Sequence, residues 1–218
     1  MITIKNMNFS YDKSSPLLLK DISLNIPKGV YLSVVGENGS CKTTLIKLIL
    51  GLLSPVSGSI KVHTSKISYV PQRVDGFNSE FPISVYEILK THAKALHLDI
   101  PSSINEALKK VNMEKFKDTL IGNLSGGQQQ RIFIARALMG NTELIILDEP
   151  STGVDLKTQE EIYSILEYVN KEFGTTIISI EHNMDIACKY SSHILKVKNG
   201  TIEYKTVCQF RDEFPIGG

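Results

Sequence analysis

The sequence lacks any hydrophobic run long enough to cross a membrane. Its longest apolar segments, residues 48–53 and 144–147, fall far short of the ~20 residues that a spanning helix needs. The first residues, from Met1 to Lys5, alternate apolar and polar side chains and lack the charged-then-apolar pattern of a secretion signal. We therefore expect a soluble, cytoplasmic chain that reaches a membrane only through a protein partner.

An excess of charge of either sign is also missing. Lys and Arg total 24 against 23 Asp and Glu, which gives a net charge of +1. General attraction to nucleic acid or to anionic lipid requires a basic surface, which this balance does not supply. The lysines within residues 109–117 are best explained as solvated helix faces. No nucleic-acid partner is expected.

Cysteine is scarce as well. Cys41, Cys188 and Cys208 are odd in number, widely spaced and free of Cys-x-x-Cys pairing. This pattern argues against a disulfide framework and against a structural zinc site. Reduced thiols are expected.

What the sequence does contain predicts an α/β fold. Its hydrophobic fraction, 42% of 218 residues, suffices for the core of one domain or of one domain with an inserted subdomain. Three apolar, β-branched runs, at residues 31–35, 144–147 and 176–180, end abruptly in polar residues, as buried parallel strands do. Helical periodicity lies between them, notably at residues 162–169. A mostly parallel sheet with flanking helices is therefore predicted.

The ends of these strands carry the polar residues of interest. Gly36 follows the first strand, Asp148 and Glu149 follow the second, and His182 follows the third. Ligands gather beyond the carboxyl ends of the strands in such sheets. We expect these side chains to meet at one site.

The single domain, residues 1–218, is expected to have two parts. Residues 1–75 and 125–218 form the α/β core, and residues 76–124, which show no clear strand pattern, form a helical subdomain. In the helical part, Ser103 and Glu106 have the spacing of a capping box.

Short alternating segments near the start of the chain indicate further strands. Apolar and polar residues alternate around Ile4, Leu24 and Ile60. This pattern is typical of antiparallel strands that cover one face. We expect an antiparallel β subdomain beside the main sheet.

A glycine-rich segment follows the first predicted strand and precedes an apolar helix, which is the context of a phosphate-binding loop. Successive backbone N–H groups and the helix N-terminus would cradle phosphates. The Lys42 ammonium would neutralise the β- and γ-phosphates of ATP, and the Thr43 hydroxyl would ligate Mg²⁺. The alternative is a glycine-rich turn without a ligand. The predicted nucleotide-binding residues here are Gly36, Glu37, Asn38, Gly39, Ser40, Cys41, Lys42, Thr43 and Thr44.

Cys41 stands immediately before the lysine, where the phosphate-loop pattern has glycine. An ordinary side chain in a glycine conformation costs roughly 1–2 kcal/mol, and its bulk keeps the backbone from the phosphates. Cys41 could therefore weaken binding or hydrolysis, and its thiol at a helix N-terminus could have a lowered pKa. A loop that tolerates the cysteine is the other outcome, and the sequence does not distinguish a natural from an introduced residue.

Two adjacent carboxylates end the second predicted strand. Asp148 would support Mg²⁺ directly or through water, and Glu149 would act as general base on the attacking water. Acidic pairs at strand ends are common, so the assignment depends on the phosphate loop that precedes it.

A second glycine-rich segment, Leu124-Ser125-Gly126-Gly127-Gln128, precedes an almost wholly apolar helix. Ser125 would cap this helix, whose N-terminus would offer a second anion site. The segment resembles the signature of the ABC ATPase family, and the phosphate loop, the signature and the Asp-Glu strand occur in that family's order. An empty helix cap would explain Ser125 but not the Gly-Gly-Gln after it.

The resemblance to the ABC ATPases implies a P-loop NTPase (RecA-like) fold, with ATP and Mg²⁺ as cofactors. In that family Ser125, Gly126, Gly127 and Gln128 would bind the γ-phosphate of ATP held by the opposite subunit. This implies a head-to-tail homodimer, or a heterodimer with another ABC ATPase.

Single residues extend the resemblance. Tyr11 corresponds to the aromatic residue that stacks on adenine, and Gln72 to the glutamine that senses Mg²⁺ and water. Asp155 resembles the loop residue that links the two sites of the dimer, and His182 the switch histidine at the γ-phosphate. Purely structural roles are the alternatives to these functions. They are packing for Tyr11, a surface position for Gln72 and a helix cap for Asp155. Glu181 departs from the family, where a small hydroxyl residue is common.

The function implied is ATP hydrolysis by Lys42, Glu149 and His182, coupled to integral membrane permease subunits at the inner face of the cell membrane. DNA-repair and chromosome relatives contain long coiled coils, and translation-factor relatives carry two modules, neither of which this chain has. A regulatory or weakly active ATP-binding module, impaired by Cys41, is the alternative.

The sequence contains little information about the transported substrate. Residues 81–87, together with 150–155 and 159–163, resemble importer subunits for zinc and manganese. Metal-ion transport is therefore expected, with import as the direction that the resemblance implies. The resemblance does not identify the permease.

Overall fold

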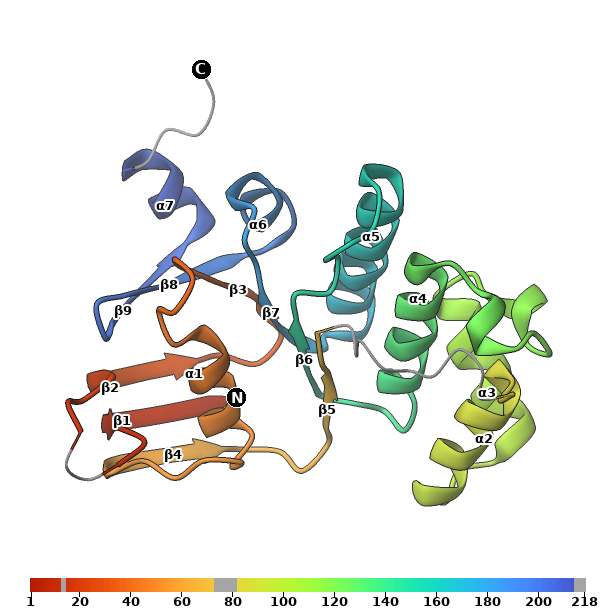
Figure 1. Cartoon of the computed structure of the whole chain (residues 1–218), viewed down its shortest axis with the longest axis horizontal. Helices are drawn as coiled ribbons and strands as arrows, with labels where there is room; N and C mark the ends of the chain where they lie inside the picture. Colours follow the sequence, from red (N-terminus) through yellow and green to blue (C-terminus); the bar gives the residue numbers. More distant parts are fainter. Residues whose placement is uncertain (13–14, 73–81, 214–218) are drawn as a thin grey trace.

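The computed structural model describes residues 1–12, 15–72 and 82–213, which form two β-sheets with flanking helices (Figure 1). In the larger sheet, all neighbouring strands pair in parallel except the last two. Its strands, in spatial order, are β5 (Ile67–Val70), β6 (Leu144–Asp148), β7 (Thr176–Ile180), β3 (Tyr31–Val35), β8 (His193–Lys198) and β9 (Thr201–Thr206). The three apolar runs of the sequence are thus central strands, buried along their whole length.

The register of the central strands brings their carboxyl ends level. Asp148 pairs with Ile180 across β6 and β7, and Val34 of β3 pairs with Ile180 from the other side. The residues that follow each strand therefore leave the sheet at one edge. This edge carries the candidate site.

The smaller sheet is antiparallel. Its order is β2 (Leu19–Ile26), β1 (Ile2–Phe9) and β4 (Ser57–Val62). Alternate residues of β1 and β2, such as Ile4 and Leu24, are buried, as the sequence pattern predicts. The inward face shares one apolar cluster with α1 (Lys42–Ile49) and the central strands.

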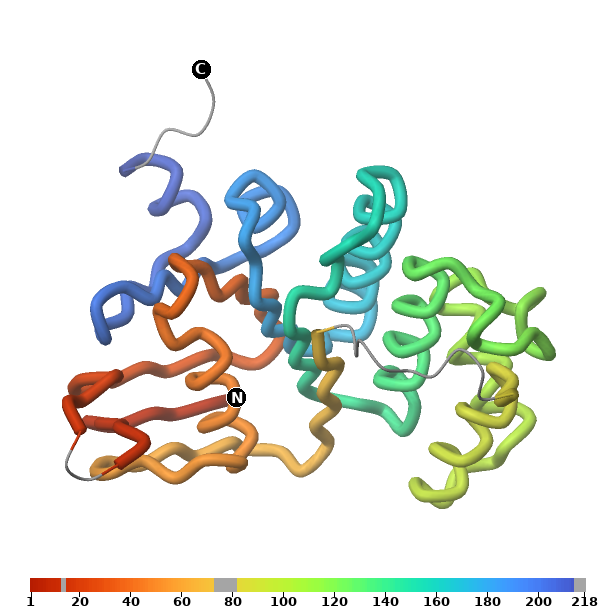
Figure 2. The backbone as a smooth tube through the Cα atoms, viewed as in Figure 1, coloured from red at the N-terminus to blue at the C-terminus, as the bar shows by residue number. Residues whose placement is uncertain are grey.

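The remaining helices divide between the large sheet and a helical group. Close to the sheet lie α5 (Leu156–Phe173), α6 (Met184–Tyr190) and α7 (Val207–Glu213). The helical group comprises α2 (Val85–Ala95), α3 (Ile100–Lys110) and α4 (Gly126–Ala137), with short 3-10 turns at Glu114–Phe116 and Ile121–Asn123. In Figure 2 this group gathers beyond β5 and β6, apart from the small sheet.

The helical group has no separate core. Leu89 of α2 and Leu108 of α3 lie in the same buried cluster as Ile132 of α4, Leu147 of β6 and Leu166 of α5. Truncating a fully buried leucine of this kind typically costs about 2–5 kcal/mol. The helical group therefore packs in one hydrophobic core with β6, the strand that ends at Asp148 and Glu149.

One local prediction is wrong. Ser103 does not cap a helix, because α3 begins one turn earlier, where the Asp99 side chain accepts a hydrogen bond from the Ser102 N–H at 3.1 Å. Pro101 in the first turn favours this earlier start. Between residues 82 and 124, a capping box is instead formed by Ser84 and Glu87 at the start of α2.

The expected boundary between residues 75 and 76 lies outside the described residues, as does Phe81 of the zinc- and manganese-type segment. Within the described ranges, no helix combines the length and the apolar character needed to cross a bilayer.

Candidate functional site

The loop between β3 and α1 wraps closely against the sheet. A Cβ on Gly36 would lie 2.4 Å from the Val197 carbonyl oxygen of β8 and 2.7 Å from the Ser40 hydroxyl, so only glycine fits. The Lys42 ammonium donates to the carbonyl oxygens of Gly36 at 2.8 Å and Glu37 at 3.0 Å. Burial lowers the Lys42 pKa, while the nearby acidic pair opposes that shift. The loop thus holds a buried cation at its centre.

Cys41 occupies the backbone conformation that favours glycine. Its φ is 76° and its ψ is 23°, in the left-handed region, and its side chain makes no cap hydrogen bond to α1. The sequence argument for backbone strain at this position is therefore supported by the geometry.

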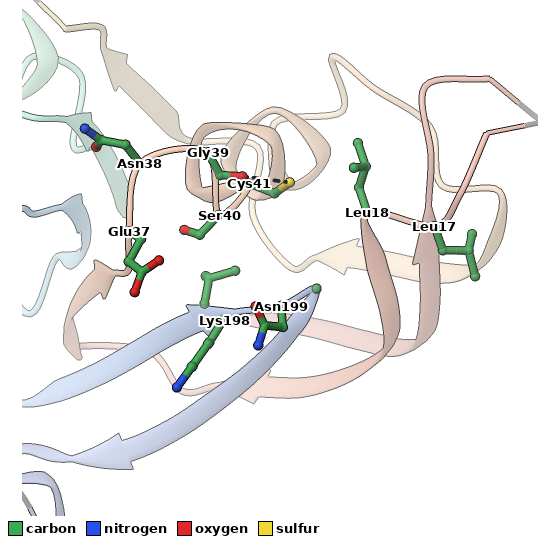
Figure 3. A pocket seen from close by; sticks show the side chains of 11 residues that line it. Leu17, Leu18, Glu37, Asn38, Gly39, Ser40, Cys41, Lys198 and Asn199 are labelled. Carbon is green, nitrogen blue, oxygen red and sulfur yellow. Dashed lines mark hydrogen bonds between the residues drawn. The ribbon is translucent and has the colours of Figure 1, made fainter.

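The Cys41 thiol lies on the flank of the loop. It donates to the Gly39 carbonyl at 3.8 Å, and Figure 3 shows its sulfur turned towards Leu18. It lines a pocket of about 310 Å³ that also includes residues 37–40 and residues 197–200. Burial raises the Cys41 pKa. The expectation of a lowered thiol pKa is thus wrong, because loss of solvation on burial disfavours the thiolate.

Asp148 is a buried carboxylate with one unused oxygen. Its Oδ2 accepts a hydrogen bond from the Tyr69 hydroxyl at 3.4 Å, and its Oδ1 has no hydrogen-bond partner among the described residues. Burial and the neighbouring Glu149 raise the pKa of Asp148. A buried, unpaired carboxylate oxygen at a strand end is suited to a cation ligand.

Three side chains from three segments converge on the Glu149 carboxylate. The Gln72 amide and the Thr152 hydroxyl, at 3.0 Å, donate to Oε2, and His182 Nε2 contacts Oε1. Glu149 has a left-handed backbone, with φ at 49°, and its side chain is 17% exposed against 45% for His182. These contacts orient the Glu149 carboxylate, and the cluster remains partly open to solvent. Of its members, the sequence analysis had not identified Thr152.

Tyr11 lies beside the phosphate-loop helix. Its hydroxyl and that of Thr44 are 3.1 Å apart, and its ring packs edge-on against Phe9 with centroids 5.1 Å apart. Its residue surface is 61% exposed. An exposed aromatic face so close to α1 is available for stacking.

The second glycine-rich segment begins α4 with a capping box. Ser125 accepts from the Gln128 N–H at 3.4 Å, and the Gln128 side chain accepts from the Ser125 N–H at 2.9 Å. Gly127 packs directly on α5, where a Cβ would lie 1.9 Å from the Thr158 methyl group. Asp155 caps α5 by accepting from the Thr158 N–H at 3.0 Å, which confirms the helix-cap alternative, and its role in linking the two sites of a dimer stays a prediction.

Comparison with known proteins identifies the arrangement. A family model described as ABC transporter matches residues 19–152, from β2 through the acidic pair. The chain belongs to the ABC transporter family. The matched residues include the candidate phosphate loop, the second glycine-rich segment (residues 124–128, called the signature segment below) and the acidic strand end. The expected family and the ATPase function of this cassette are confirmed.

The relatives cover nearly all of the cassette. A Treponema pallidum protein named "Probable metal transport system ATP-binding protein" is 38% identical over 98% of this chain and 89% of its own length. The zinc uptake system ATP-binding protein ZurA of Listeria innocua is 36% identical over 93% of this chain and 84% of its own length.

Solved structures agree with the fold. CbiO1 of Clostridium perfringens, part of the ABC transporter complex cbiONQ, superposes with a TM-score of 0.87 at 30% identity and covers 97% of this chain and 90% of its own. The dimeric structure of the bacterial cassette MJ0796 gives 0.77 at 27% identity over 95% and 99%. The predicted α/β P-loop fold is confirmed.

Proposed function

We propose that this cassette is the ATP-hydrolysing subunit of a metal-ion importer, with Glu149 as the general base. The convergence of Gln72, Thr152 and His182 on the Glu149 carboxylate carries the assignment. These contacts hold both oxygens of a partly exposed carboxylate in a fixed direction, which is what activation of a water molecule requires. The relatives named for metal and zinc uptake support the cargo.

ATP would lie on the phosphate loop. The Lys42 ammonium, which donates hydrogen bonds to two loop carbonyls in this structure, would turn to the β- and γ-phosphates of ATP. The backbone N–H groups before α1 would also bind these phosphates. The exposed ring of Tyr11 would stack on adenine. His182, already at Glu149, would contact the γ-phosphate.

The acidic strand end fits Mg²⁺. Asp148 offers a buried oxygen that lacks a hydrogen-bond partner in the described part of the chain. The Gln72 side chain contacts Glu149, the residue after Asp148, and Thr43 lies in the first turn of α1, next to the loop. Oxygen ligands of this kind suit Mg²⁺, which neutralises charge that develops on the phosphates. Asp148, Thr43 and Gln72 would hold it.

A head-to-tail dimer explains the signature segment. Figure 1 places α1 and α4 on opposite sides of β5 and β6, so the start of α4 lies away from the phosphate loop of its own chain. The N-terminus of α4 remains a ready anion site. A second cassette would bring its ATP to Ser125, Gly126, Gly127 and Gln128, and the dimeric relative supports such a pairing.

Transport tests the proposal. The cassette would work on the cytoplasmic face with membrane permease subunits, and ATP hydrolysis would drive import of zinc or manganese. Copurification with the native permease and reconstitution into vesicles should give ATP-dependent uptake of one of these ions, absent with Lys42→Ala. ATP hydrolysis without uptake of either metal would contradict the proposal that the transported substrate is zinc or manganese. Absence of phosphate release would contradict the proposal that the chain is an ATPase.

A further inference from the structure

A second carboxyl group is buried beneath the Glu149 cluster. Glu181 follows β7, directly precedes His182, and is only 4% exposed. Its backbone N–H donates to the Val34 carbonyl at 3.0 Å, which keeps the residue within the sheet. A carboxylate at this depth requires hydrogen-bond donors on its oxygens.

Two hydroxyl groups supply those donors. The Ser179 hydroxyl donates to Oε1 of Glu181, and the Tyr163 hydroxyl donates to Oε2. Tyr163 lies on α5, is 1% exposed, and stacks on the ring of Tyr190 with centroids 5.3 Å apart. The Glu181 carboxylate thereby joins the end of β7 to the buried face of α5.

The hydrogen bonds continue from Tyr163 to the loop after the acidic pair. The Tyr163 hydroxyl oxygen lies 2.9 Å from the Ser151 hydroxyl, which accepts from the Gln159 amide at 2.7 Å. Because Tyr163 has one hydroxyl proton and gives it to Glu181, its oxygen must accept from Ser151. The donors thus run in one direction, from Gln159 through Ser151 and Tyr163 to the carboxylate.

These contacts close a ring that contains the proposed catalytic pair. Ser151 lies two residues after Glu149, Glu181 directly precedes His182, and His182 contacts the Glu149 carboxylate. One half of the ring is the partly exposed Glu149–His182 pair, and the other half is the buried Tyr163–Glu181 pair. The buried Tyr163–Glu181 pair therefore sets the distance between the segment that carries Glu149 and the segment that carries His182.

We propose that Glu181 is a positioning residue for ATP hydrolysis. Through the hydroxyls of Tyr163 and Ser151, it holds the loop that carries Glu149 in a fixed place against His182. This inference rests on the proposed function, since it takes Glu149 as the residue that acts on water. Glu181 itself touches neither the phosphate loop nor the signature segment among the described contacts.

The test removes single atoms from the ring. Tyr163→Phe deletes one oxygen and retains the ring that packs on Tyr190, whereas Glu181→Gln replaces one acceptor oxygen by a donor. Neither change reaches the phosphate loop, so turnover should fall while the KM for ATP stays constant. Tyr190→Phe is the matched control. It keeps the aromatic ring that stacks on Tyr163 and removes a hydroxyl that takes no part in the closed set of contacts between Glu149, Tyr163 and Glu181.

Steady-state phosphate release by the full chain with Mg²⁺ and ATP measures both constants. We expect Tyr163→Phe and Glu181→Gln each to lower kcat about tenfold, with KM within about twofold of the parent and Tyr190→Phe unchanged. The double variant should also lose about tenfold, because both changes break the same link. A hundredfold loss in the double variant, or parent kcat in folded Tyr163→Phe, overturns the proposal.

A spectroscopic readout separates this inference from the proposed function. The His182 ring proton signal, assigned by its loss in His182→Ala, should shift in Tyr163→Phe and Glu181→Gln and stay in place in Tyr190→Phe. An unchanged His182 signal overturns the inference even if the parent hydrolyses no ATP. If Glu181→Gln does not fold, Ser151→Ala replaces it, with the same expected loss of kcat and the same shift.

Discussion

At the scale of single residues, the backbone of Cys41 bears directly on turnover. Cys41 has a left-handed φ of 76° and lies in the loop that we propose holds the phosphates. A side chain in this conformation costs roughly 1–2 kcal/mol relative to glycine. The strain is present in a segment whose N–H groups have to align with ATP.

We predict that Cys41→Gly raises kcat, by up to about tenfold if 1.4 kcal/mol of transition-state stabilisation is regained. Cys41→Ala is the matched control, because it keeps the Cβ and removes the sulfur. If strain is the cause, the alanine variant stays near the parent rate. Steady-state kinetics under reducing conditions decide, and equal kcat and KM for parent and Cys41→Gly would show that the loop tolerates the cysteine.

Glu181 makes stability depend on pH in an unusual direction. Burial, the largest cause, raises its pKa from 4.5 to about 7, although the hydroxyls of Ser179 and Tyr163 oppose this shift. The folded state therefore binds more protons than the unfolded state between these two pKa values. Its contribution to stability is present at low pH and is lost as pH rises through this window.

We predict that the parent loses stability relative to Glu181→Gln as pH rises from about 5 to about 8, by about 3 kcal/mol. The glutamine does not titrate, so the difference between the two proteins isolates this group from the other carboxylates. Urea unfolding at both pH values measures it. A difference that stays constant with pH would contradict the raised pKa.

At the scale of helices, Gly127 sets how closely α4 approaches α5. A Cβ there would meet the Thr158 methyl group at 1.9 Å, and the Thr158 hydroxyl is held by Asp155 at 2.7 Å. The methyl group cannot turn away without breaking the hydrogen bond from the Thr158 hydroxyl to Asp155. The signature segment and the start of α5 are therefore packed as one unit.

We predict that Gly127→Ala lowers the free energy of unfolding by about 1–3 kcal/mol through overpacking. Thr158→Ser removes the obstructing methyl group and keeps the cap hydroxyl, so the double variant should recover most of the loss. Thr158→Ser alone is the control. No recovery in the double variant would mean that the destabilisation has another origin.

At the scale of the whole molecule, the features that the sequence predicts are those with a local pattern. The buried strands show as apolar runs because both faces of the central sheet are covered, and their polar ends meet because parallel registers bring them level. Gly36 and Lys42 were predictable because a phosphate loop requires a fixed spacing.

Other features arise only when distant segments meet. Tyr163 sits beside Ile162 in an apolar helical pattern, and nothing local indicates that its hydroxyl reaches Glu181, 18 residues away. The only signal was that Glu181 departs from the family pattern. The start of α3 was missed because Asp99 and Pro101 compete with Ser103 as local start signals.

The central claim is that this cassette hydrolyses ATP with Glu149 as the base. The most direct test is phosphate release by the full chain and by Glu149→Gln, with ATP binding and mass in solution measured on the same samples. The account predicts a fall in turnover of about a hundredfold or more, unchanged ATP affinity, and a dimer that ATP holds closed. Hydrolysis by Glu149→Gln at the parent rate would contradict it.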